Sequence, residues 1–315
     1  MPALICGSLA FDTITTFPGR FAEQILPDQV HILNVSFLVP TLRREWGGCA
    51  GNIAYNLQAL GGQPVVLAAL GVDGGEYQAR IAGWGADTRL ILRDAQLHTA
   101  QCHITTDRDN NQIAAFHPGA MSNAHQMAVP TQAQRSDLGD LGDLGDLAIG
   151  IIAPDGRDAM WQHAHQMAEQ NIPFIFDPGQ QLPQFNGEEH REIIGLARWV
   201  AVNDYEARML QERTGEDAAA ISRRANIQGV IVTLAEQGCE IWMQGERVHV
   251  PGVKAERVVD PTGCGDAFRA ALLYGLERGW PLARCAALGN RLGALKIAER
   301  GPQNHTIDPG LLASV

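Results

Sequence analysis

Short apolar runs alternate with amphipathic stretches along most of the chain. The runs are continuously apolar and rich in branched residues, a pattern typical of strands that are buried on both faces of a sheet. Strands are predicted at residues 4–6, 65–70, 147–153, 172–176, 199–202 and 230–233, and helices at 52–60, 158–169 and 204–212. This alternation predicts a doubly wound, mostly parallel α/β sheet with helices on both faces.

Two segments interrupt the alternation. Residues 11–44 and 93–121 contain short stretches that suit strands outside the main sheet. We expect them to form a small β-sheet that acts as a lid, and residues 1–10, 45–92 and 122–315 to form the α/β core. Residues 137–147 repeat an Asp-Leu-Gly unit, whose three-residue period favours a solvated connection over a calcium site.

The composition excludes several classes of protein. The 315 residues carry 24 basic and 35 acidic side chains, a net charge of −11, and the scattered arginines offer no basic patch for a nucleic acid. Apolar runs stay shorter than the roughly 18 residues of a membrane span, and residues 1–10 show no leader pattern, so we expect a cytoplasmic protein without a membrane partner. The 6 cysteines are dispersed without a Cys-x-x-Cys pair, which argues against a zinc site or a disulfide framework.

Lysine is scarce, and this limits the phosphate chemistry that the chain can use. Its two lysines, Lys254 and Lys296, do not follow a glycine, whereas a P-loop requires Gly-Lys-Ser/Thr. Neither lysine lies in a Val-Ala-Ile-Lys strand of the protein-kinase type. The sequence therefore excludes both a P-loop and a protein-kinase fold.

The segment Asp260-Pro-Thr-Gly-Cys-Gly-Asp266 is the most informative part of the chain, because its glycines precede an apolar helix. Gly263 and Gly265 let backbone N–H groups converge, and a helix N-terminus carries about half a positive charge, so an anion such as phosphate is favoured there. Asp266 lies in the same loop, where its charge would oppose a bound anion unless it takes part in the chemistry. The loop alone leaves two roles open for Asp266, a general base and a simple helix cap.

Two other polar clusters accompany the loop. Gly47 and Gly48 precede a predicted helix, and Asn52 could either bond a hydroxylated ligand or cap that helix. Asn203 and Glu206 follow a predicted strand, and their spacing of three places them on one face of the chain. The same spacing fits a capping box, which is the interpretation that the spacing alone favours.

These clusters together resemble the ribokinase-like (PfkB) family of carbohydrate and nucleoside kinases over nearly the whole chain. The resemblance rests on Gly47-Gly48-x-x-x-Asn52 and on Asp260-Pro-Thr-Gly-x-Gly-Asp266-Ala-Phe268, with Asn203-x-x-Glu206 between them. It implies a kinase that uses ATP and Mg²⁺, with an anion hole built from the amides of residues 263–265, Gly263, Cys264 and Gly265. It also implies that Asp266 is the base for a primary hydroxyl, that Asn203 lies near the ATP phosphates, and that Glu206 holds Mg²⁺ through water.

Within the family, four segments are similar to stretches of the bacterial adenosine kinase branch, namely residues 17–21, 36–39, 116–121 and 177–181. The similarity implies phosphorylation of the 5′-hydroxyl of a purine nucleoside, adenosine to AMP in purine salvage. It implies that ribose hydroxyls are held by Ser8, Asp12, Gly48 and Asn52, that Phe116 lies against the purine, and that further substrate contacts come from Ser36, Gln180 and Gln181.

The resemblance also implies a nucleotide side of the site and two further properties. Thr233, Gly238 and Asn290 are expected to contact ATP, and Asp260 and Thr262 to hold a monovalent cation such as K⁺. The lid is expected to pair two subunits into a homodimer, because exposed sheet edges are usually covered.

Two residues near the glycine loop keep alternative roles. Arg269 could contact a phosphate oxygen or form a salt bridge. Cys264 could be a reactive thiolate at the helix N-terminus or a small residue that fills space, and the second role is favoured.

Alternative functions also stay open. Another nucleoside, or ribose or fructose as the acceptor of a sugar kinase of the same family, would fit the two signatures. A non-catalytic nucleotide-binding regulator is the alternative from another class, and the joint presence of Asp12, Asn52 and Asp266 argues against it.

Overall fold

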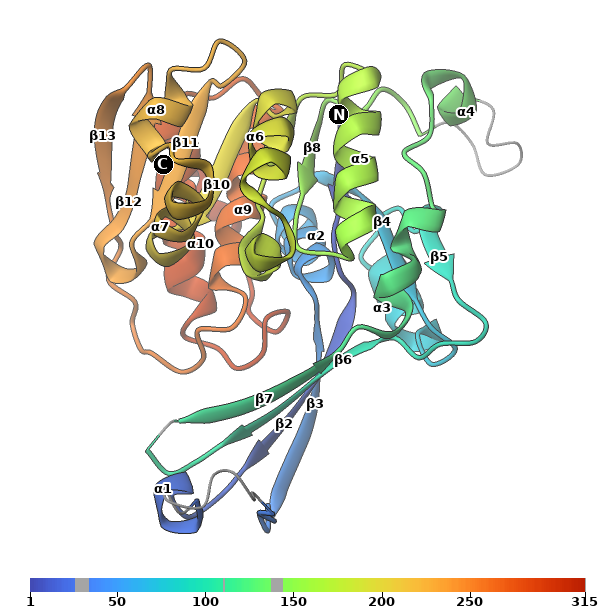
Figure 1. The fold of residues 1–315 in the computed structure, drawn as a ribbon, viewed down its shortest axis with the longest axis vertical. Coiled ribbons are helices and arrows are strands. Elements are labelled where there is room, and N and C mark those ends of the chain that lie inside the picture. Colours follow the sequence, from blue (N-terminus) through green and yellow to red (C-terminus); the bar gives the residue numbers. More distant parts are fainter. Residues whose placement is uncertain (26–33, 110, 137–143, 315) are drawn as a thin grey trace.

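The computed structural model describes residues 1–25, 34–109, 111–136 and 144–314. Its strands form two sheets (Figure 1). The large sheet has the order β13-β12-β11-β10-β9-β8-β1-β4-β5 and the small sheet the order β3-β2-β6-β7. The strands are β1 (Pro2–Cys6), β2 (Ala10–Thr16), β3 (Thr41–Gly47), β4 (Gln63–Leu70), β5 (Ile91–Arg93), β6 (Ala100–Thr106), β7 (Gln112–His117), β8 (Ile149–Ile152), β9 (Phe174–Phe176), β10 (Trp199–Asn203), β11 (Gly229–Thr233), β12 (Gly238–Met243) and β13 (Glu246–Pro251).

Helices cover both faces of the large sheet. Helices α2, α3, α9 and α10 pack on one face, and α5, α6, α7 and α8 pack on the other. Their bounds are α1 (Phe21–Gln24), α2 (Cys49–Ala59), α3 (Gly75–Gly83), α4 (Gln132–Ser136), α5 (Arg157–Glu169), α6 (Gly187–Leu196), α7 (Asp204–Thr214), α8 (Ala218–Ser222), α9 (Cys264–Leu276) and α10 (Leu282–Lys296). Short 3₁₀ turns are η2 (Gly119–Gln126), η4 (Gly179–Gln184), η5 (Ala235–Gln237) and η6 (Pro309–Ser314).

The predicted α/β fold is confirmed, because the strands from β11 to β5 all pair in parallel. Only β12 and β13, at one end of the large sheet, pair antiparallel. Each predicted strand and helix overlaps an observed one, since continuous apolar runs form strands that helices bury from both sides. The helix that follows the glycine loop is α9, which lies against α2 and α10.

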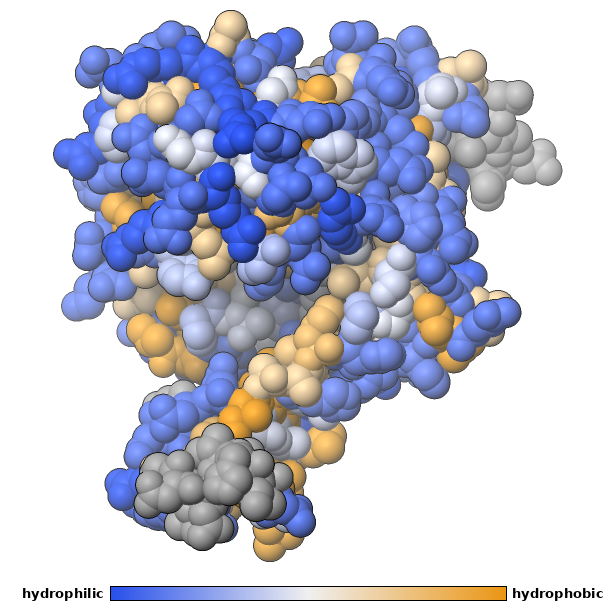
Figure 2. Space-filling view, in the orientation of Figure 1, coloured by the Kyte–Doolittle hydropathy of each residue, from blue (hydrophilic) through white to orange (hydrophobic). Residues whose placement is uncertain are grey.

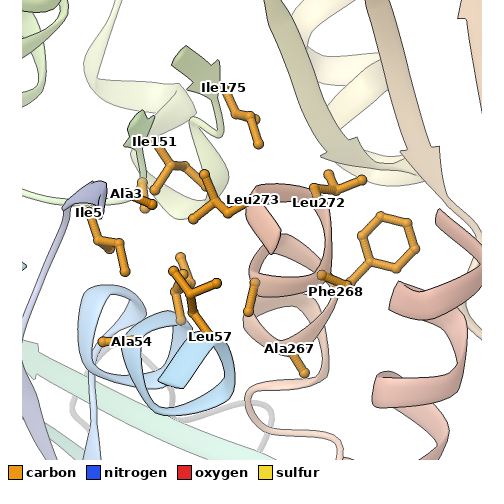
Figure 3. Packing of buried hydrophobic residues seen from close by; sticks show 14 of the residues in the cluster. Ala3, Ile5, Ala54, Leu57, Ile151, Ile175, Ala267, Phe268, Leu272 and Leu273 are labelled. Carbon is orange, nitrogen blue, oxygen red and sulfur yellow. The ribbon is translucent and has the colours of Figure 1, made fainter. Parts of the chain in front are cut away.

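The core next to the N-terminus of α9 is an aliphatic layer between α2, α9 and the sheet (Figure 3). Leu57 of α2 and Leu273 of α9 are fully buried between the helices and Ile5 and Ile151 of the central strands. Phe268 extends from α9 towards α10, where Gly289 leaves room for its ring. Tight packing of this layer fixes the N-terminus of α9 relative to the ends of the strands.

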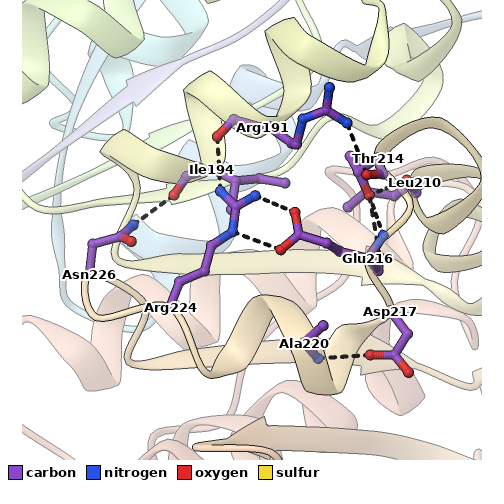
Figure 4. Close-up of polar contacts among 9 residues, drawn as sticks. All are labelled: Arg191, Ile194, Leu210, Thr214, Glu216, Asp217, Ala220, Arg224 and Asn226. Carbon is purple, nitrogen blue, oxygen red and sulfur yellow. Dashed lines mark hydrogen bonds and ion pairs between the residues drawn. The ribbon is translucent and has the colours of Figure 1, made fainter.

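The opposite face is held by polar contacts as well as by apolar packing (Figure 4). Arg224 forms an ion pair with Glu216 and donates a hydrogen bond to the backbone oxygen of Arg191 at 2.9 Å. Asn226 donates to the backbone oxygen of Ile194 at 2.7 Å. These contacts join α6 to the segments that flank α8, so the backbone groups that end α6 are satisfied.

The small sheet leaves the large one as a narrow ribbon (Figure 1). Strand β2 pairs antiparallel with β3 and parallel with β6, so that Asp12 lies opposite Glu45 on one side and Cys102 on the other. The strands fall in or beside the two segments expected to form the lid, although β3 continues to Gly47. Residues 137–143 of the expected solvated connection lie outside the described residues, whereas Leu144 and Leu147 are buried. No helix in the described part of the chain has the length and hydrophobicity needed to cross a membrane.

Candidate active site

A cavity of about 440 Å³ opens where the parallel strands of the large sheet end. Its walls come from the turns after β8, β9, β10 and β11 and from the start of α9. Ligand sites of open α/β sheets are built at these carboxyl ends. The cavity brings together residues that the sequence singled out, namely Gln180, Asn203, Glu206, Thr233, Gly263, Gly265 and Asp266.

The glycine loop places the N-terminus of α9 in the wall of this cavity. Gly263 is the N-cap residue with φ of 82°, and a Cβ there would lie 2.6 Å from the Cβ of Pro302. Only glycine fits both restrictions. The amide of Cys264 donates to the backbone oxygen of Pro261 at 3.2 Å, whereas the amides of Gly265 and Asp266 have no partner within the helix. The start of α9 can therefore offer backbone donors and a partial positive charge to an anion.

Cys264 occupies this first turn as a packed thiol. Burial raises the pKa of Cys264 to about 11, so the thiol is protonated near neutral pH in spite of the helix N-terminus. Its Sγ atom lies 3.7 Å from the backbone oxygen of Gly293. The structure therefore favours the space-filling role over a reactive thiolate.

Asp266 lies in the first turn of α9, and no side chain caps this helix. The helix-cap role is therefore wrong for Asp266. Its Oδ2 atom accepts a hydrogen bond of 2.8 Å from Nδ2 of Asn52 on α2. Burial, together with the charge of Asp177, raises the pKa of Asp266 to about 6 in spite of this bond. A carboxylate with a pKa near neutrality is suited to accept a proton from an alcohol.

Asn52 itself is fixed by residues that the sequence did not single out. Its Oδ1 atom accepts a hydrogen bond of 3.0 Å from Nε2 of Gln303, which also donates to the hydroxyl of Tyr77 at 2.6 Å. Tyr77 in turn donates to the backbone oxygen of Gly47 at 2.6 Å. This buried chain of hydrogen bonds links the second glycine cluster to Asp266. The side chain of Asn52 thus contacts the carboxylate of Asp266 and does not cap α2, whose N-cap residue is Gly48. Its contact with ribose stays a prediction.

Asp12 is the second carboxylate of the site and lies on β2 of the small sheet. Its side chain is buried against Gly47. A methyl group on Gly47 would collide with it, because the Cβ would lie 2.4 Å from Oδ2 of Asp12. Burial and the charge of Asp266 raise the pKa of Asp12 to about 6. The two carboxylates are thus close enough to affect each other's protonation, and a group bound between them meets two hydrogen-bond acceptors.

Ser8 and Gly48 shape the backbone beside these carboxylates. The Oγ atom of Ser8 accepts a hydrogen bond of 3.2 Å from the amide of Cys49 at the start of α2. Gly48 has φ of 86°, and a Cβ there would lie 2.5 Å from the backbone oxygen of Ser8. The close approach of the two backbones requires glycine at this position.

Asn203 and Glu206 form the capping box that their spacing favours. Oδ1 of Asn203 accepts from the amide of Glu206 at 2.7 Å, and Oε2 of Glu206 accepts from the amide of Asn203 at 2.8 Å. Both residues also line the cavity. Burial and the charge of Asp177 raise the pKa of Glu206. The capping box therefore fixes a carboxylate at the edge of the anion site.

Arg269 forms a buried salt bridge with Asp177 at the end of β9. Its Nε and Nη2 atoms each lie 3.1 Å from a carboxylate oxygen of Asp177. Of the two roles that the sequence left open, the salt bridge is the one that the structure shows.

The lining of the cavity contains four acidic side chains beside Arg269, namely Asp177, Asp204, Glu206 and Asp266. A polyphosphate bound there would be repelled unless a divalent cation accompanied it.

Several predicted residues lie apart from this cavity. Phe116 and Gln181 line a second cavity of about 400 Å³. Ser36 is exposed beside Phe37, which packs on Phe17 and Phe21 near the far end of the small sheet. Gly238 begins β12 in a tight turn, and Asn290 donates to the backbone oxygens of Val250 and Pro251, so its amide group holds α10 to β13.

Asp260, which was expected to hold a monovalent cation together with Thr262, is already occupied by other contacts. The carboxylate of Asp260 accepts hydrogen bonds of 3.0 Å from the amides of Thr262 and Gly301, and it pairs with Arg43 of β3 at 3.5 Å. Although burial would raise it, these amides and the Lys296 ammonium hold the pKa of Asp260 below its ordinary value. The backbone oxygen of Asp260 accepts from Nζ of Lys296 at 2.8 Å. The oxygens of Asp260 are thus already engaged by donors of this chain.

Comparison with known proteins agrees with this geometry. Residues 20–308 match the family model described as pfkB family carbohydrate kinase. A nucleoside kinase of Methanocaldococcus jannaschii is 26% identical over 274 residues, covering 86% of this chain and 85% of that protein. A nucleoside kinase of Burkholderia thailandensis, solved with inosine, is 44% identical with a TM-score of 0.84, and the match covers 99% of this chain and 96% of the other.

A second structure of the B. thailandensis enzyme, described as a complex with ADP-inosine, is 46% identical with a TM-score of 0.81. The match covers 99% of this chain and 94% of the other. The family model, the identity and the anion loop with its carboxylate lead to one conclusion. The chain belongs to the pfkB carbohydrate kinase family and is a phosphotransferase that acts on a hydroxyl group.

Proposed function

We propose that this enzyme transfers the γ-phosphoryl group of ATP to the 5′-hydroxyl of a purine nucleoside, with Asp266 as the general base. The observation that carries the proposal is the position of Asp266, a carboxylate of raised pKa at the mouth of the amide loop and close to Asp12. Phosphoryl transfer asks mainly for positioning and for charge stabilisation, and these groups supply both.

The acceptor side of the proposal uses Asp12 and its neighbours. A buried carboxylate can accept two hydrogen bonds from a vicinal diol, which would fix the ribose ring through Asp12. Ser8 and Gly48 lie beside it and offer further polar backbone contacts. With the ring fixed, the 5′-hydroxyl would face Asp266, which takes its proton as the oxygen attacks.

The donor side uses the backbone rather than a lysine. The amides of Gly263, Cys264 and Gly265 and the start of α9 would stabilise charge on the transferred group. Asn203, Thr233 and Glu206 line the remainder of the cavity, where we propose that the nucleotide lies. The acidic lining fits Mg²⁺, which Glu206 would hold through water and which would neutralise phosphate charge when bound. Gly238 and Asn290 would then affect ATP binding indirectly, through the shape of the backbone next to the cavity.

The purine would extend towards the second cavity, which Phe116 and Gln181 line beside Met121. Phe116 is half exposed there, and an aromatic face left open is suited to stack on a base. Gln180, which lines the first cavity, would lie on the sugar side. The resemblance implies adenosine as the acceptor, whereas the inosine in the B. thailandensis structures favours a wider range of purine nucleosides.

A panel of acceptors tests the proposal. The release of ADP from ATP would be measured with adenosine, inosine, guanosine, cytidine, ribose and fructose, each with and without Mg²⁺. The proposal expects the highest kcat/KM with a purine nucleoside, and product analysis should locate the phosphate at the 5′ position. Higher kcat/KM with ribose or fructose would refute a nucleoside acceptor. Absence of turnover with every acceptor would favour the regulator instead.

We also propose that the small sheet is a lid and that it pairs two subunits in the cytoplasm. Its edge strand β7 is exposed along its length and carries Ile113 and Phe116. Hydrophobic side chains gather on the face of this sheet that is visible in Figure 2. An exposed apolar edge strand favours pairing with another chain. Light scattering tests the pairing, and a monomeric mass would contradict it.

A further inference from the structure

Lys296 places a buried ammonium group directly behind the anion loop. It is the last residue of α10, and its side chain is fully buried. Nζ donates to the backbone oxygen of Asp260 at 2.8 Å and to that of Glu299 at 3.0 Å. Asp260 begins the segment that ends at Asp266, so the ammonium contacts the same stretch of backbone that carries the proposed base and the anion-binding amides.

The surroundings of Lys296 are those of a cation site. Backbone carbonyl oxygens replace the water shell of a bound K⁺ ion in proteins, and here two of them face the ammonium. The carboxylate of Asp260 adds negative charge nearby, and the C-terminal end of α10 adds a further partial charge. A buried charge requires such compensation, because an unpaired charge is strongly disfavoured outside water.

Charged and titratable groups from several elements surround this ammonium, and they include His305 near the C-terminus. Burial lowers the pKa of Lys296, while Asp260, Cys264 and Glu299 act in the opposite direction and Arg43 acts with burial. Arg43 reaches the site from the small sheet, where it pairs with the Asp260 carboxylate. The oxygens that would bind a metal cation are therefore divided between two protein cations and backbone amides.

We propose that the Lys296 ammonium replaces a monovalent metal cation behind the anion loop, so that catalysis is independent of K⁺. The inference rests on the proposed phosphoryl transfer at this loop. Lys296 is a positioning residue, because it contacts backbone and does not touch the reacting atoms. Its fixed charge holds Asp260 and the loop in the geometry that a bound cation would otherwise maintain.

The wild-type enzyme provides the first test, and it needs no variant. Initial rates would be measured with the sodium-free and potassium-free tetramethylammonium salt of ATP, and again after addition of KCl at constant ionic strength. Independence of K⁺ predicts a change in kcat of less than about twofold, or about 0.4 kcal/mol. A rise of about tenfold or more with K⁺ would overturn the proposal.

The second test uses the other lysine as a matched control. Lys296→Met keeps the length of the side chain and removes its charge, whereas Lys254→Met removes an exposed charge from the same chain. Lys296→Met should lose at least about tenfold in kcat without K⁺ and regain much of it with K⁺ or NH₄⁺. Lys254→Met should keep wild-type rates in both buffers. Loss of activity that neither ion restores, in a variant that is folded by circular dichroism, would refute the proposed replacement.

Thermal unfolding gives a readout that is independent of turnover. The melting temperature of Lys296→Met should rise on addition of K⁺, because an ion that binds only the folded state stabilises it. The wild type should show no such rise over tetramethylammonium at equal ionic strength. If Lys296→Met does not fold, Lys296→Arg replaces it as a variant that keeps the positive charge. The melting temperature of the wild type with and without K⁺ then decides the question. A K⁺-specific rise in the melting temperature of the wild type would refute the proposal. Absence of turnover with every acceptor, together with the expected melting temperatures, would refute only the proposed function.

Discussion

Asp266 should lower the stability of the folded protein at neutral pH, and Asp266→Asn should reveal by how much. Burial raises the pKa of Asp266 from 3.8 to about 6, with a further contribution from Asp177. The folded state must therefore hold an ionised group that it disfavours by about 3 kcal/mol. Asparagine has a similar shape and no charge, and it keeps an oxygen that can accept from Asn52.

The pH dependence follows from the direction of this shift. The folded pKa lies above the unfolded one, so the destabilisation is absent below about pH 4, grows between about pH 4 and pH 6, and is complete above that. Asp266→Asn should thus be more stable than the wild type at pH 8 by up to about 3 kcal/mol, or roughly 4–5 °C in melting temperature for a chain of this size. The gain should vanish near pH 4. The same variant should lose about 10²–10⁴-fold in kcat.

Melting temperatures of the two proteins would be measured by circular dichroism at about pH 8, 7, 6, 5 and 4. Asp204→Asn is the matched control, since Asp204 lines the same cavity but is exposed, and we expect little change in its melting temperature. A gain in Asp266→Asn that is absent at pH 8, or that persists unchanged at pH 4, would refute the raised pKa of Asp266. A kcat near that of the wild type would refute its role as the base.

Three further predictions concern the walls of the site. Cys264→Ala should leave the rate of inactivation by iodoacetamide at neutral pH unchanged, because the thiol of pKa about 11 is protonated, and a slower inactivation would contradict this. Gly47→Ala should raise the KM for the acceptor at least about tenfold, because the added methyl group would displace Asp12. The KM for ATP should stay constant, and equal effects on both KM values would contradict the prediction. Arg269→Met should lower the free energy of unfolding by about 3–5 kcal/mol, because Asp177 would be left buried without its partner. Thermal unfolding measures this loss, and a melting temperature equal to that of the wild type would contradict it.

The parallel part of the fold was predictable from local patterns. A run such as 65–70 is apolar on both sides, and only a strand covered by helices on both faces buries it fully. The glycine turn before α9 was also predictable, because glycines directly before an apolar helix favour a turn at its N-terminus, whereas anion binding there stays a prediction. The antiparallel edge was missed, although Gln244 and Gly245, both with positive φ, form a tight turn between β12 and β13.

The partners within the site were not predictable, because they join positions far apart in the chain. Asn52 donates to Asp266 across 214 residues, and Gln303 reaches Asn52 across 251. A capping box such as Asn203 with Glu206 depends on three residues of spacing and was visible in the sequence. Lys296 carried a signal only through its rarity, and its role depends on carbonyl groups whose direction the sequence does not reveal.

The ion pair between Arg43 and Asp260 ties the small sheet to the loop that precedes α9. Its nitrogen and oxygen are 3.5 Å apart, and the arginine side is partly open to water, so the pair contributes about 1 kcal/mol or less. Thermal motion breaks so weak a contact readily. If the small sheet is the lid that we propose, a contact this weak would favour its position near the loop and would add little to the barrier for its release.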